Sequence, residues 1–600
     1  MKNLTTFDIE IYPNYFLCAF RSAKTGKLKS WSRINNEKVD FSDMFDFMDN
    51  RTLVSFNGIN FDMVLLAALR KGASNAKLKE ICDYIILTGK PAYQVLKYFK
   101  LQPLFYDHID ISNVAKGMAG LKQYGARIHS KSIQELPYSP DKSLTEDQAE
   151  QVKSYCENDL KLTQDLFDKL KDQIQLRVDM SDMYGIDLRS KSDAQIAEAV
   201  FRSEFKQRNI EFSLKHDIQK ELFYTAPSYI KFKSDELNQL LVDIQKQAIV
   251  LGKSDKYKSP PCFLSDRKLK SGRVKKEKRV ITLGTVQVTL ALGGLHSLET
   301  NVHIESGKQR IIDRDVASYY PRMILNNNWY PETLGQAFIK LYEKIVNDRL
   351  AAKKAKDTIT AEALKIVING SYGKLGNHYS CLYTPRLMMQ TTITGQLSLL
   401  MFIEMLTLNG HSVLSANTDG VVTLVEDYDN FIKVVKQWEQ ITNFETEETE
   451  YSTYFARDVN NYLAITTGGK LKRKGVFADY ALDKNPMYKV VYDAVLFYLL
   501  FGIDVSCYIR NCRNVEDFML VTSSTCGAVN KEGERVGKVL RFYYSTIEKN
   551  TLFSSGSGAT IPRSTDSRLC SAFPESFPND IDYDRYIAIA NGVLNLAIEE

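Results

Sequence analysis

Acidic residues recur at three places near the start of this 600-residue chain, with spacings that suit a divalent metal site. Asp8 and Glu10 lie on a strand predicted over 4–16, where alternate side chains share a face. Asp62 follows a second short strand. Asp159 lies four residues after Tyr155 on one face of a long helix, which a capping box over 145–148 is predicted to open. Four carboxylates could hold two metal ions, one activating water and one stabilising a leaving oxygen. A solvated surface acid is the simpler interpretation of any one alone; the ordered set favours a metal site.

A second pair of acids lies beyond residue 300. Asp315 follows the apolar strand predicted at 310–313 and precedes a turn closed by Pro321. Asp419 lies at the tip of a predicted hairpin with strands at 411–416 and 421–425. A carboxylate at a strand end is held still enough to bind a divalent cation. The two acids are therefore candidates for one metal site.

Two helices are predicted between these acids, over 336–356 and 360–376, joined by a short turn as an antiparallel hairpin. Each helix carries a stripe of polar or aromatic side chains three or four residues apart: Arg349 and Lys353 on the first, Lys365, Asn369 and Tyr372 on the second. Facing stripes with three cations suit a triphosphate, which needs charge and bidentate donors. For Lys353, a solvated helix charge is the better interpretation.

Composition bounds the remaining possibilities. With 44% hydrophobic and 25% charged residues, the chain is typical of an ordinary soluble protein, too long for a single core. Nine cysteines without a C-x-x-C pattern, and seven histidines without paired spacing, indicate reduced thiols rather than zinc sites. No signal peptide is predicted, and the apolar run 494–503 is too short to span a membrane.

Local charge is more informative than the net charge of +5. The segment 253–279 holds eleven basic and three acidic residues and is interrupted by two prolines. It is predicted as a loop or hairpin that could lie along phosphates. A solvated basic linker is an equally good interpretation.

The three N-terminal acidic sites resemble the Exo I, II and III motifs (D-x-E, N-x-x-x-F-D and Y-x-x-x-D) of DEDDy proofreading exonucleases, over residues 1 to about 170. The later stretches resemble motifs A, B and C of the family B DNA polymerases (D-x-x-S-x-Y-P, K-x-x-x-N-S-x-Y-G and Y-x-D-T-D-S). The matching stretches are 315–321, 365–373 and 417–420. Among the family residues that are replaced, the motif B serine is Gly370 here, and the first aspartate and the serine of motif C are Asn417 and Gly420.

The resemblance implies a role for each matching residue. The catalytic and metal-binding set is Asp8, Glu10, Asp62 and Asp159 with Tyr155 orienting the water, and Asp315 and Asp419 with the Val316 carbonyl. Nucleotide binding falls to Val316, Ser318, Tyr320, Arg349, Lys353, Lys365 and Asn369, with Tyr320 as the sugar gate. DNA binding falls to Asn57, Phe61, Gly293, Gly294, Tyr372, Gly373, Thr418, Lys470 and Lys472. The paired glycines match a Y-x-G-G element only in part, because Ala291 replaces its tyrosine.

The predicted fold is a mixed α/β and α+β multidomain protein, with an RNase H-like exonuclease and a right-hand polymerase whose palm is a βαβ-rich sheet. The predicted boundaries are 1–170 for the exonuclease domain, 171–290 for a connecting helical and basic region, 291–335 and 379–475 for the palm, 336–378 for the fingers and 476–600 for the thumb. Residues 171–250 are predicted as mostly helical, and residues from 476 onward are predicted as helices alternating with polar loops.

The predicted function is DNA-directed DNA polymerase with a proofreading 3′–5′ exonuclease, using two Mg²⁺ per site with Mn²⁺ as a substitute. Expected partners are primer–template DNA, dNTPs and replication accessory proteins, with no membrane. The protein is expected to be a monomer in the cytoplasm, which for a phage replicase is the cytoplasm of the host. Only 33 residues separate Asp315 from Arg349, too few for the insertion of protein-primed members, so a nucleic-acid primer is expected. Two alternatives stay open: a protein that acts chiefly as an exonuclease, and a catalytically weakened DNA-binding homologue.

Overall fold

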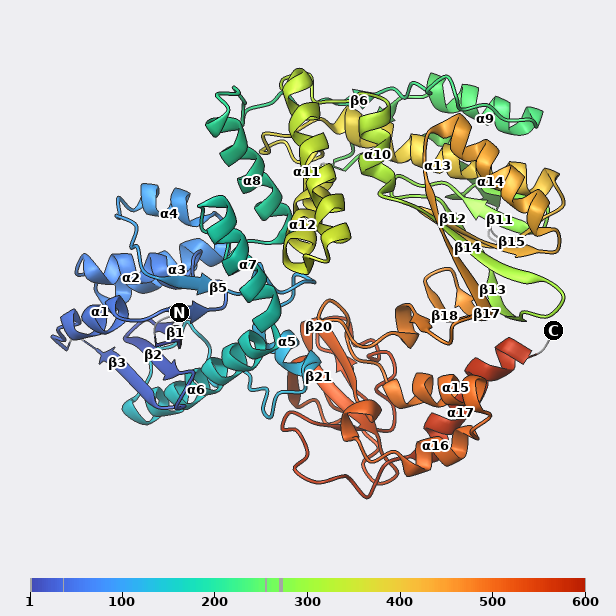
Figure 1. The fold of residues 1–600 in the computed structure, drawn as a ribbon. Helices are drawn as coiled ribbons and strands as arrows, with labels where there is room; N and C mark the ends of the chain where they lie inside the picture. The colour runs from blue at the N-terminus through green and yellow to red at the C-terminus, as the bar shows by residue number, and fades with distance from the viewer. Residues whose placement is uncertain (1–2, 36, 254–255, 269–272, 599–600) are drawn as a thin grey trace. The chain divides into compact units, whose positions relative to one another are not determined.

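The computed structural model describes residues 3–35, 37–253, 256–268 and 273–598, which divide into two compact units. One unit comprises Met1–Ser192 and Tyr480–Ile589, and the other comprises Asp193–Asp479 with the last residues of the chain. Each unit combines helices with strands, so the prediction of a mixed α/β multidomain protein is confirmed (Figure 1).

The first unit is built on a five-stranded sheet in the order β3-β2-β1-β4-β5. Its strands are β1 (Thr5–Tyr12), β2 (Tyr15–Ser22), β3 (Leu28–Ile34), β4 (Leu53–Ser55) and β5 (His108–Asp110). β1 is antiparallel to β2 and parallel to β4, which is parallel to β5. The prediction of one strand over 4–16 is wrong, because Pro13 and Asn14 form a tight turn where proline's missing N–H ends the ladder. Asp8 and Glu10 lie in the middle of β1.

Seven helices follow the strands in the described N-terminal part of this unit. They are α1 (Ser42–Asp49), α2 (Asp62–Arg70), α3 (Asn75–Thr88), α4 (Ala92–Tyr98), α5 (Leu121–Arg127), α6 (Glu146–Lys169) and α7 (Lys171–Tyr184). The predicted capping box at the start of α6 is confirmed: the Thr145 side chain accepts from the Gln148 N–H, and the Gln148 side chain accepts from the Thr145 N–H. α6 packs on β1 and β2, so its buried face, with Tyr155 and Asp159, meets the acids of β1.

The C-terminal part of the first unit is richer in strands than predicted. Its elements are α15 (Lys489–Phe501), α16 (Val505–Asn511) and a four-stranded sheet of β22 (Phe553–Ser554), β20 (Leu520–Val529), β21 (Arg535–Tyr544) and β23 (Ser567–Leu569); α17 spans Tyr583–Ile598. The prediction of helices alternating with loops is therefore wrong for β20 and β21, whose ten residues each form a long antiparallel ladder. Buried Arg541 fixes this sheet by donating to the carbonyls of Ser130 and Cys570.

The second unit is built on a large sheet in which every described ladder is antiparallel. Its strands are β10 (Val280–Leu283), β11 (Val286–Thr289), β12 (His296–Ser297), β13 (Thr300–Glu305), β14 (Arg310–Val316), β15 (Ser412–Asn417), β16 (Gly420–Val425), β17 (Thr446–Asp458), β18 (Asn461–Thr466) and β19 (Leu471–Arg473). The predicted βαβ-rich sheet is a wrong expectation, because parallel pairing is what a βαβ unit produces. β14, which ends with Asp315 and Val316, lies between β16 and β17 inside the sheet.

Helices α13 (Pro385–Leu408) and α14 (Tyr428–Thr442) cover one face of this sheet and form with it the largest core. Buried Trp438 packs against Phe402 there. Within the described residues, α13 alone is long and apolar enough to cross a membrane, and 83% of its apolar window is buried inside the protein, as in a core helix.

The predicted helical hairpin is confirmed as α11 (Gly335–Ala355) and α12 (Thr358–Lys374), which pack against each other. α12 also packs on α8 (Asp193–Gln207), and a Cβ on Gly370 would lie 2.5 Å from the Asp193 carbonyl oxygen. Glycine at this position therefore lets α8 pack closely. The described part of the basic segment includes the exposed hairpin of β8 (Leu264–Lys268) and β9 (Val274–Lys278), and its residues 254–255 and 269–272 lie outside the described residues.

The other elements of the second unit are short. They are β6 (Glu221–Leu222), β7 (Ile249–Val250), α9 (Asp235–Lys246) and α10 (Tyr319–Asn326), which follows β14. The residues between α8 and α9 are mostly irregular, so the prediction of a mostly helical segment over 171–250 holds only for α7, α8 and α9.

Candidate active sites

The first unit brings the predicted acids of β1 together with an unpredicted thiol. One carboxylate oxygen each of Asp8 and Glu10 and the Sγ of Cys156 all lie within 4.8 Å of one another. Cys156 is on α6, next to Tyr155, and its Sγ lies 3.9 Å from an oxygen of Asp8. Alternation along β1 places the two acids on one face, and the packing of α6 on β1 brings the thiol to them.

Asp62 and Asp159 complete the predicted set of four acids. Their side chains are 3% and 7% exposed, and in each the Oδ1 atom is buried without a hydrogen-bond partner among the described residues. A buried, unpaired carboxylate oxygen costs free energy unless a cation or a proton satisfies it. The two orphaned oxygens therefore indicate a site that takes up positive charge.

The loop that carries Asp62 is held by Asp110, which the sequence analysis missed. Asp110 is fully buried at the end of β5, and its carboxylate accepts from the N–H groups of Asn57 and Ile59 at 2.9 and 3.0 Å. Asn57 adopts a left-handed conformation with φ +66° and is exposed, while the predicted DNA-binding Phe61 is half-buried beside it. Within the described residues, no hydrogen bond joins the side chain of Asn57 or Phe61 to the four acids.

Burial and mutual repulsion dominate the electrostatics of this site. Burial raises the pKa of Asp8 well above its usual range, and the charges of Asp62 and Glu10 add to the rise. Burial likewise raises the pKa of Asp62 to about 7 and that of Glu10 well above its usual range. Burial, with the charge of Asp159, raises the pKa of the Tyr155 hydroxyl. In the absence of a cation the cluster therefore favours bound protons.

One lysine near this site was missed by the sequence analysis. Lys122, on α5, places its Nζ over the Tyr155 ring at 4.7 Å from the ring centre. Its charge lowers the pKa of Glu10 and of Asp159, although burial outweighs that effect in both. No motif marks Lys122, because its role depends on the packing of α5 against α6.

The same acids border a large hollow of the first unit. The hollow has a volume of about 1620 Å³, and Asp159 and Lys122 are among its lining residues. Three further basic side chains, Arg535, Lys538 and Arg541, line it against one other acid, Glu135. Its net positive lining suits an anionic chain.

In the second unit, the ends of β14 and β16 bring the two predicted acids side by side. Asp315 pairs with Gly420 in the ladder, and the Val316 N–H donates to the carbonyl of Asp419 at 2.8 Å. A Cβ on Gly420 would lie 2.2 Å from Oδ1 of Asp315. Glycine in place of the family serine therefore leaves room for the carboxylate of Asp315 over the turn.

A lysine already partly balances the charge of this pair. The Nζ of Lys472, on β19, lies 3.6 Å from an oxygen of Asp315 and 2.9 Å from one of Asp313. Lys472 also donates to the Tyr451 hydroxyl at 3.0 Å. Asp313 is buried, and the sequence analysis missed it. Burial raises the pKa of Asp315 to about 6, and the nearby Lys472 opposes that rise; burial also raises the pKa of Asp419.

The turn between β15 and β16 also contacts the paired glycines. Thr418 has φ +56°, and its N–H donates to the carbonyl of Leu295 at 3.0 Å. A Cβ on Gly294 would lie 3.2 Å from the Thr418 Oγ1. Asn417 turns its amide away from the acids, donating to the Val459 carbonyl at 3.3 Å. The structure therefore brings Gly293 and Gly294 to the predicted site but leaves Asn417 as a neutral part of the turn.

Some predicted residues of the helical hairpin meet the acidic strand, and others do not. The rings of Tyr320 and Tyr372 stack at 4.8 Å, and Arg349 points a guanidinium nitrogen to 3.5 Å from the Ser318 Oγ. Lys365 instead forms an ion pair with Glu362 on its own helix at 3.2 Å. The remaining members of the predicted set are exposed: Lys353, Asn369, Gly373 and Lys470.

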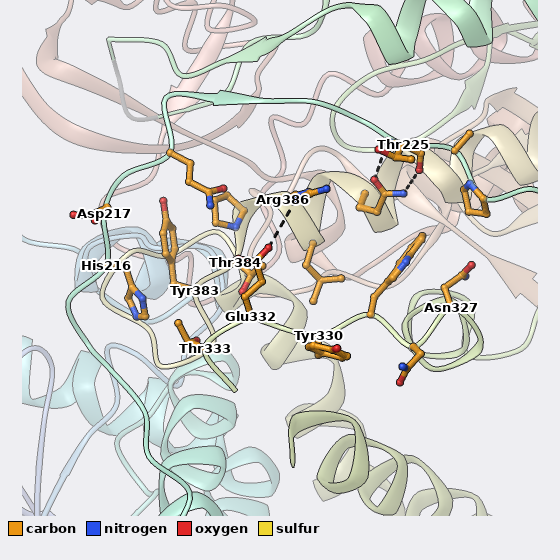
Figure 2. A pocket seen from close by; sticks show the side chains of 18 of the residues that line it. His216, Asp217, Thr225, Asn327, Tyr330, Glu332, Thr333, Tyr383, Thr384 and Arg386 are labelled. Carbon is orange, nitrogen blue, oxygen red and sulfur yellow. Dashed lines mark hydrogen bonds and ion pairs between the residues drawn. The ribbon is translucent and has the colours of Figure 1, made fainter. Parts of the chain in front are cut away.

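A separate pocket of about 840 Å³ in the second unit contains none of the predicted residues (Figure 2). Figure 2 shows Tyr330 and Tyr383 on its walls and the ion pair between Arg386 and Glu332 across it. Lys215 and Asp217 also line it, so its fixed charges cancel. A neutral pocket lined by rings does not suit phosphates, and we keep it separate from the acidic sites.

Comparison with solved structures finds a family B DNA polymerase from the hyperthermophilic archaeon Pyrobaculum calidifontis. The two are 13% identical with a TM-score of 0.41, over all of this chain and 78% of that one. No protein-family model and no curated protein matches. At this level of likeness, functional inference depends on the side chains of the two sites.

Proposed function

We propose that the protein is a DNA-directed DNA polymerase of the family B type, with a 3′–5′ proofreading exonuclease in its first unit. The observation that supports this most strongly is the pairing of β14 with β16, which sets Asp315 beside Asp419 with the Tyr320–Tyr372 stack and Arg349 near the same strand end. Two accessible acids beside ring and guanidinium groups suit a metal-bound nucleoside triphosphate.

Each residue of the polymerase site has a proposed task. Asp315, Asp419 and the Val316 carbonyl hold two Mg²⁺, or Mn²⁺ in their place. When bound, the ions supply charge neutralisation for the triphosphate and acidify the primer 3′-hydroxyl. Tyr320, stacked on Tyr372, presents a ring to the sugar. Arg349, Lys353, Lys365 and Asn369 bind the phosphates, which for Lys365 requires exchange of its exposed Glu362 partner.

Contacts to the primer and template come from the sheet in the proposed assignment. Lys472 lies within reach of Asp315 from β19 and binds the primer-terminal phosphate, with Lys470 nearby. Gly293 and Gly294 allow close approach of a strand beside Thr418, because glycine adds no side chain there. Gly373 does the same at the end of α12.

The exonuclease site uses the four acids of the first unit. Asp8, Glu10, Asp62 and Asp159 hold the metal ions, and Tyr155 orients the attacking water beside Lys122. The order of antiparallel and parallel strands around β1 is similar to that of an RNase H-like sheet. The basic hollow beside Asp159 accommodates a single DNA strand in the proposed assignment, and Asn57 and Phe61 are further proposed contacts to that strand.

The rest of the assignment follows from these two sites. The proposed parts are those expected from the sequence: exonuclease 1–170, connecting region 171–290, palm 291–335 and 379–475, fingers 336–378 and thumb 476–600. Primer–template DNA and dNTPs are the substrates, and replication accessory proteins are further partners. We propose a monomeric phage or plasmid replicase that acts in the cytoplasm.

Primer extension tests this function and its two alternatives. A 5′-labelled primer annealed to a longer template is incubated with Mg²⁺, with and without dNTPs. We expect extension with dNTPs, shortening without them, and neither with a chelator. Shortening in both conditions would support an exonuclease alone, and a retarded but unchanged primer would support a DNA-binding homologue.

A further inference from the structure

Cys156 is a buried thiol that lies at the edge of an apolar core and beside a carboxylate cluster. It is 0% exposed, and its Sγ lies 3.9 Å from an Asp8 oxygen, within the group of ligand atoms that also includes Glu10. A buried cysteine more often behaves as a small hydrophobe. Here the thiol also has two acids as neighbours, and carboxylates are ligands for a cation.

A second observation is that two buried carboxylate oxygens of this cluster are unpaired. Oδ1 of Asp62 and Oδ1 of Asp159 are buried and have no hydrogen-bond partner in the described part of the chain. Both acids lie close enough to Asp8 for their charges to act on it. The thiol therefore faces a region where four carboxylates compete for cations.

We propose that Asp8, Glu10 and Cys156 form a binding site for the thiophilic cation Zn²⁺, with the Cys156 sulfur as a direct ligand. Zn²⁺ accepts mixed sulfur and oxygen ligands, with Zn–S about 2.3 Å and Zn–O about 2.0–2.2 Å. Those lengths place neighbouring ligand atoms about 3.5 Å apart in a tetrahedron. Rotation of the side chains by roughly 1 Å closes the 4.8 Å cluster to that size.

The same atoms discriminate between metal ions. Mg²⁺ prefers oxygen ligands and uses the carboxylates alone, whereas thiolate selects softer ions. On binding, the S–H bond of Cys156 breaks, a sulfur–zinc bond forms, and the proton passes to solvent, so no oxidant or reductant is needed. Three protein ligands leave one position of the tetrahedral ion for water, and the zinc competes with Mg²⁺ because it occupies Asp8 and Glu10.

Zn²⁺ bound in this way blocks the metal sites of the exonuclease, and this consequence rests on the proposed function. The zinc site itself does not depend on it. The polymerase acids have no cysteine in a comparable cluster among the described residues. We therefore expect zinc to suppress degradation at a lower concentration than it suppresses extension.

Cadmium titration of the metal-free full-length chain tests the site, because a cadmium–thiolate bond absorbs in the ultraviolet. The starting protein carries serine at Cys507, Cys512 and Cys526, the thiols that are not buried. We expect one equivalent of Cd²⁺ to produce the band. Cys156→Ser, which keeps a donor to Asp8, should abolish it and weaken binding at least about tenfold, the lower range for loss of a metal's supporting partner.

Two further variants keep the test decisive. Cys381→Ser removes a buried thiol of the second unit and should leave the band unchanged. Glu10→Gln keeps the thiol but removes a carboxylate ligand, so the band should require at least about tenfold more Cd²⁺. If Cys156→Ser does not fold, Glu10→Gln is the variant that tests the site. A band that persists in folded Cys156→Ser, or affinity unchanged in Glu10→Gln, would overturn the proposal.

Zinc inhibition provides the functional readout. For each protein, the rate of shortening in excess Mg²⁺ is expressed relative to that protein's own rate without zinc. The Zn²⁺ concentration that halves this rate is then compared between proteins. Cys156→Ser should need at least about tenfold more zinc than the starting protein. Absence of any shortening would count against the exonuclease and leave the cadmium result standing; equal inhibition of both proteins would overturn the proposal.

Discussion

The two acidic sites balance their charge in opposite ways. In the first unit, Asp8, Glu10, Asp62 and Asp159 crowd together in a buried cluster, where orphaned oxygens and raised pKa values indicate missing positive charge. In the second unit, Asp315 already lies 3.6 Å from the Nζ of Lys472. The carboxylates of the first site therefore repel one another unless a cation binds them. In the second site, Lys472 already neutralises part of the carboxylate charge.

Neutralising one acid at each site gives the largest expected contrast. Asp62→Asn should raise the free energy of unfolding of the metal-free protein by about 1–3 kcal/mol at pH 8, because it removes a repelled buried charge. Asp315→Asn should not raise it, because Lys472 loses a partner. Each change should reduce the activity of its own site roughly 10³-fold. Denaturant unfolding with a chelator, beside extension and shortening rates, measures both effects.

That contrast would fail if Asp315→Asn stabilised the protein as much as Asp62→Asn. Such a result would mean that Lys472 does not balance the pair in solution.

The close packing of Gly420 against Asp315 predicts the next largest effect. Gly420→Ala puts a Cβ where Oδ1 of Asp315 lies, so that carboxylate must move. A displacement of about 1 Å in an active site costs on the order of 100-fold in rate. Extension should fall by that factor while shortening is unchanged. Gly468→Ala, where the nearest atom is 3.9 Å from the added Cβ, is the matched control.

Removal of the Lys472 side chain tests whether this lysine neutralises the acids Asp313 and Asp315. Lys472→Ala leaves buried Asp313 without its cation, and we expect a loss of about 1–3 kcal/mol in the free energy of unfolding. Extension should weaken through a higher KM for the primer. Lys470→Ala, an exposed lysine of the same segment, should leave stability unchanged. Equal stability of both variants would contradict the role of the Lys472–Asp313 pair.

The smallest predicted effect concerns pH. A metal ion binds the ionised carboxylate, and the pKa is about 7 for Asp62 but about 6 for Asp315. Lowering the pH from 8 to 6 should raise the Mg²⁺ requirement about tenfold for shortening and about twofold for extension. Because the folded pKa of Asp62 is raised, the stability that its proton provides is lost as the pH rises through about 7. Mg²⁺ titrations of both activities between pH 6 and 8 measure the difference.

Local patterns predicted much of the fold and of the acidic sets. Alternation predicted the shared face of Asp8 and Glu10, the capping box predicted the start of α6, and helical periodicity predicted α11 and α12 within two residues. Each of these depends on residues close together in the sequence.

The missed features depend on contacts between distant segments. Lys122 reaches Tyr155 through helix packing, and Lys472 is 159 residues from Asp313. In the sequence alone, Gly420 is only a replacement of the family serine. The structure gives the reason, because the Asp315 carboxylate occupies the space that a side chain at 420 would need. The long strands β20 and β21 were missed because their sequences mix polar and apolar residues in the way that loops do.

Reciprocal inactivation tests the central claim most directly. Wild type, Asp419→Ala and Asp8→Ala are assayed on one labelled primer–template with Mg²⁺ and dNTPs, and again without dNTPs. We predict that Asp419→Ala loses extension but still shortens the primer, and that Asp8→Ala still extends but no longer shortens. Extension that survives Asp419→Ala, or that disappears with Asp8→Ala in a folded protein, would contradict the assignment of separate synthetic and degrading sites.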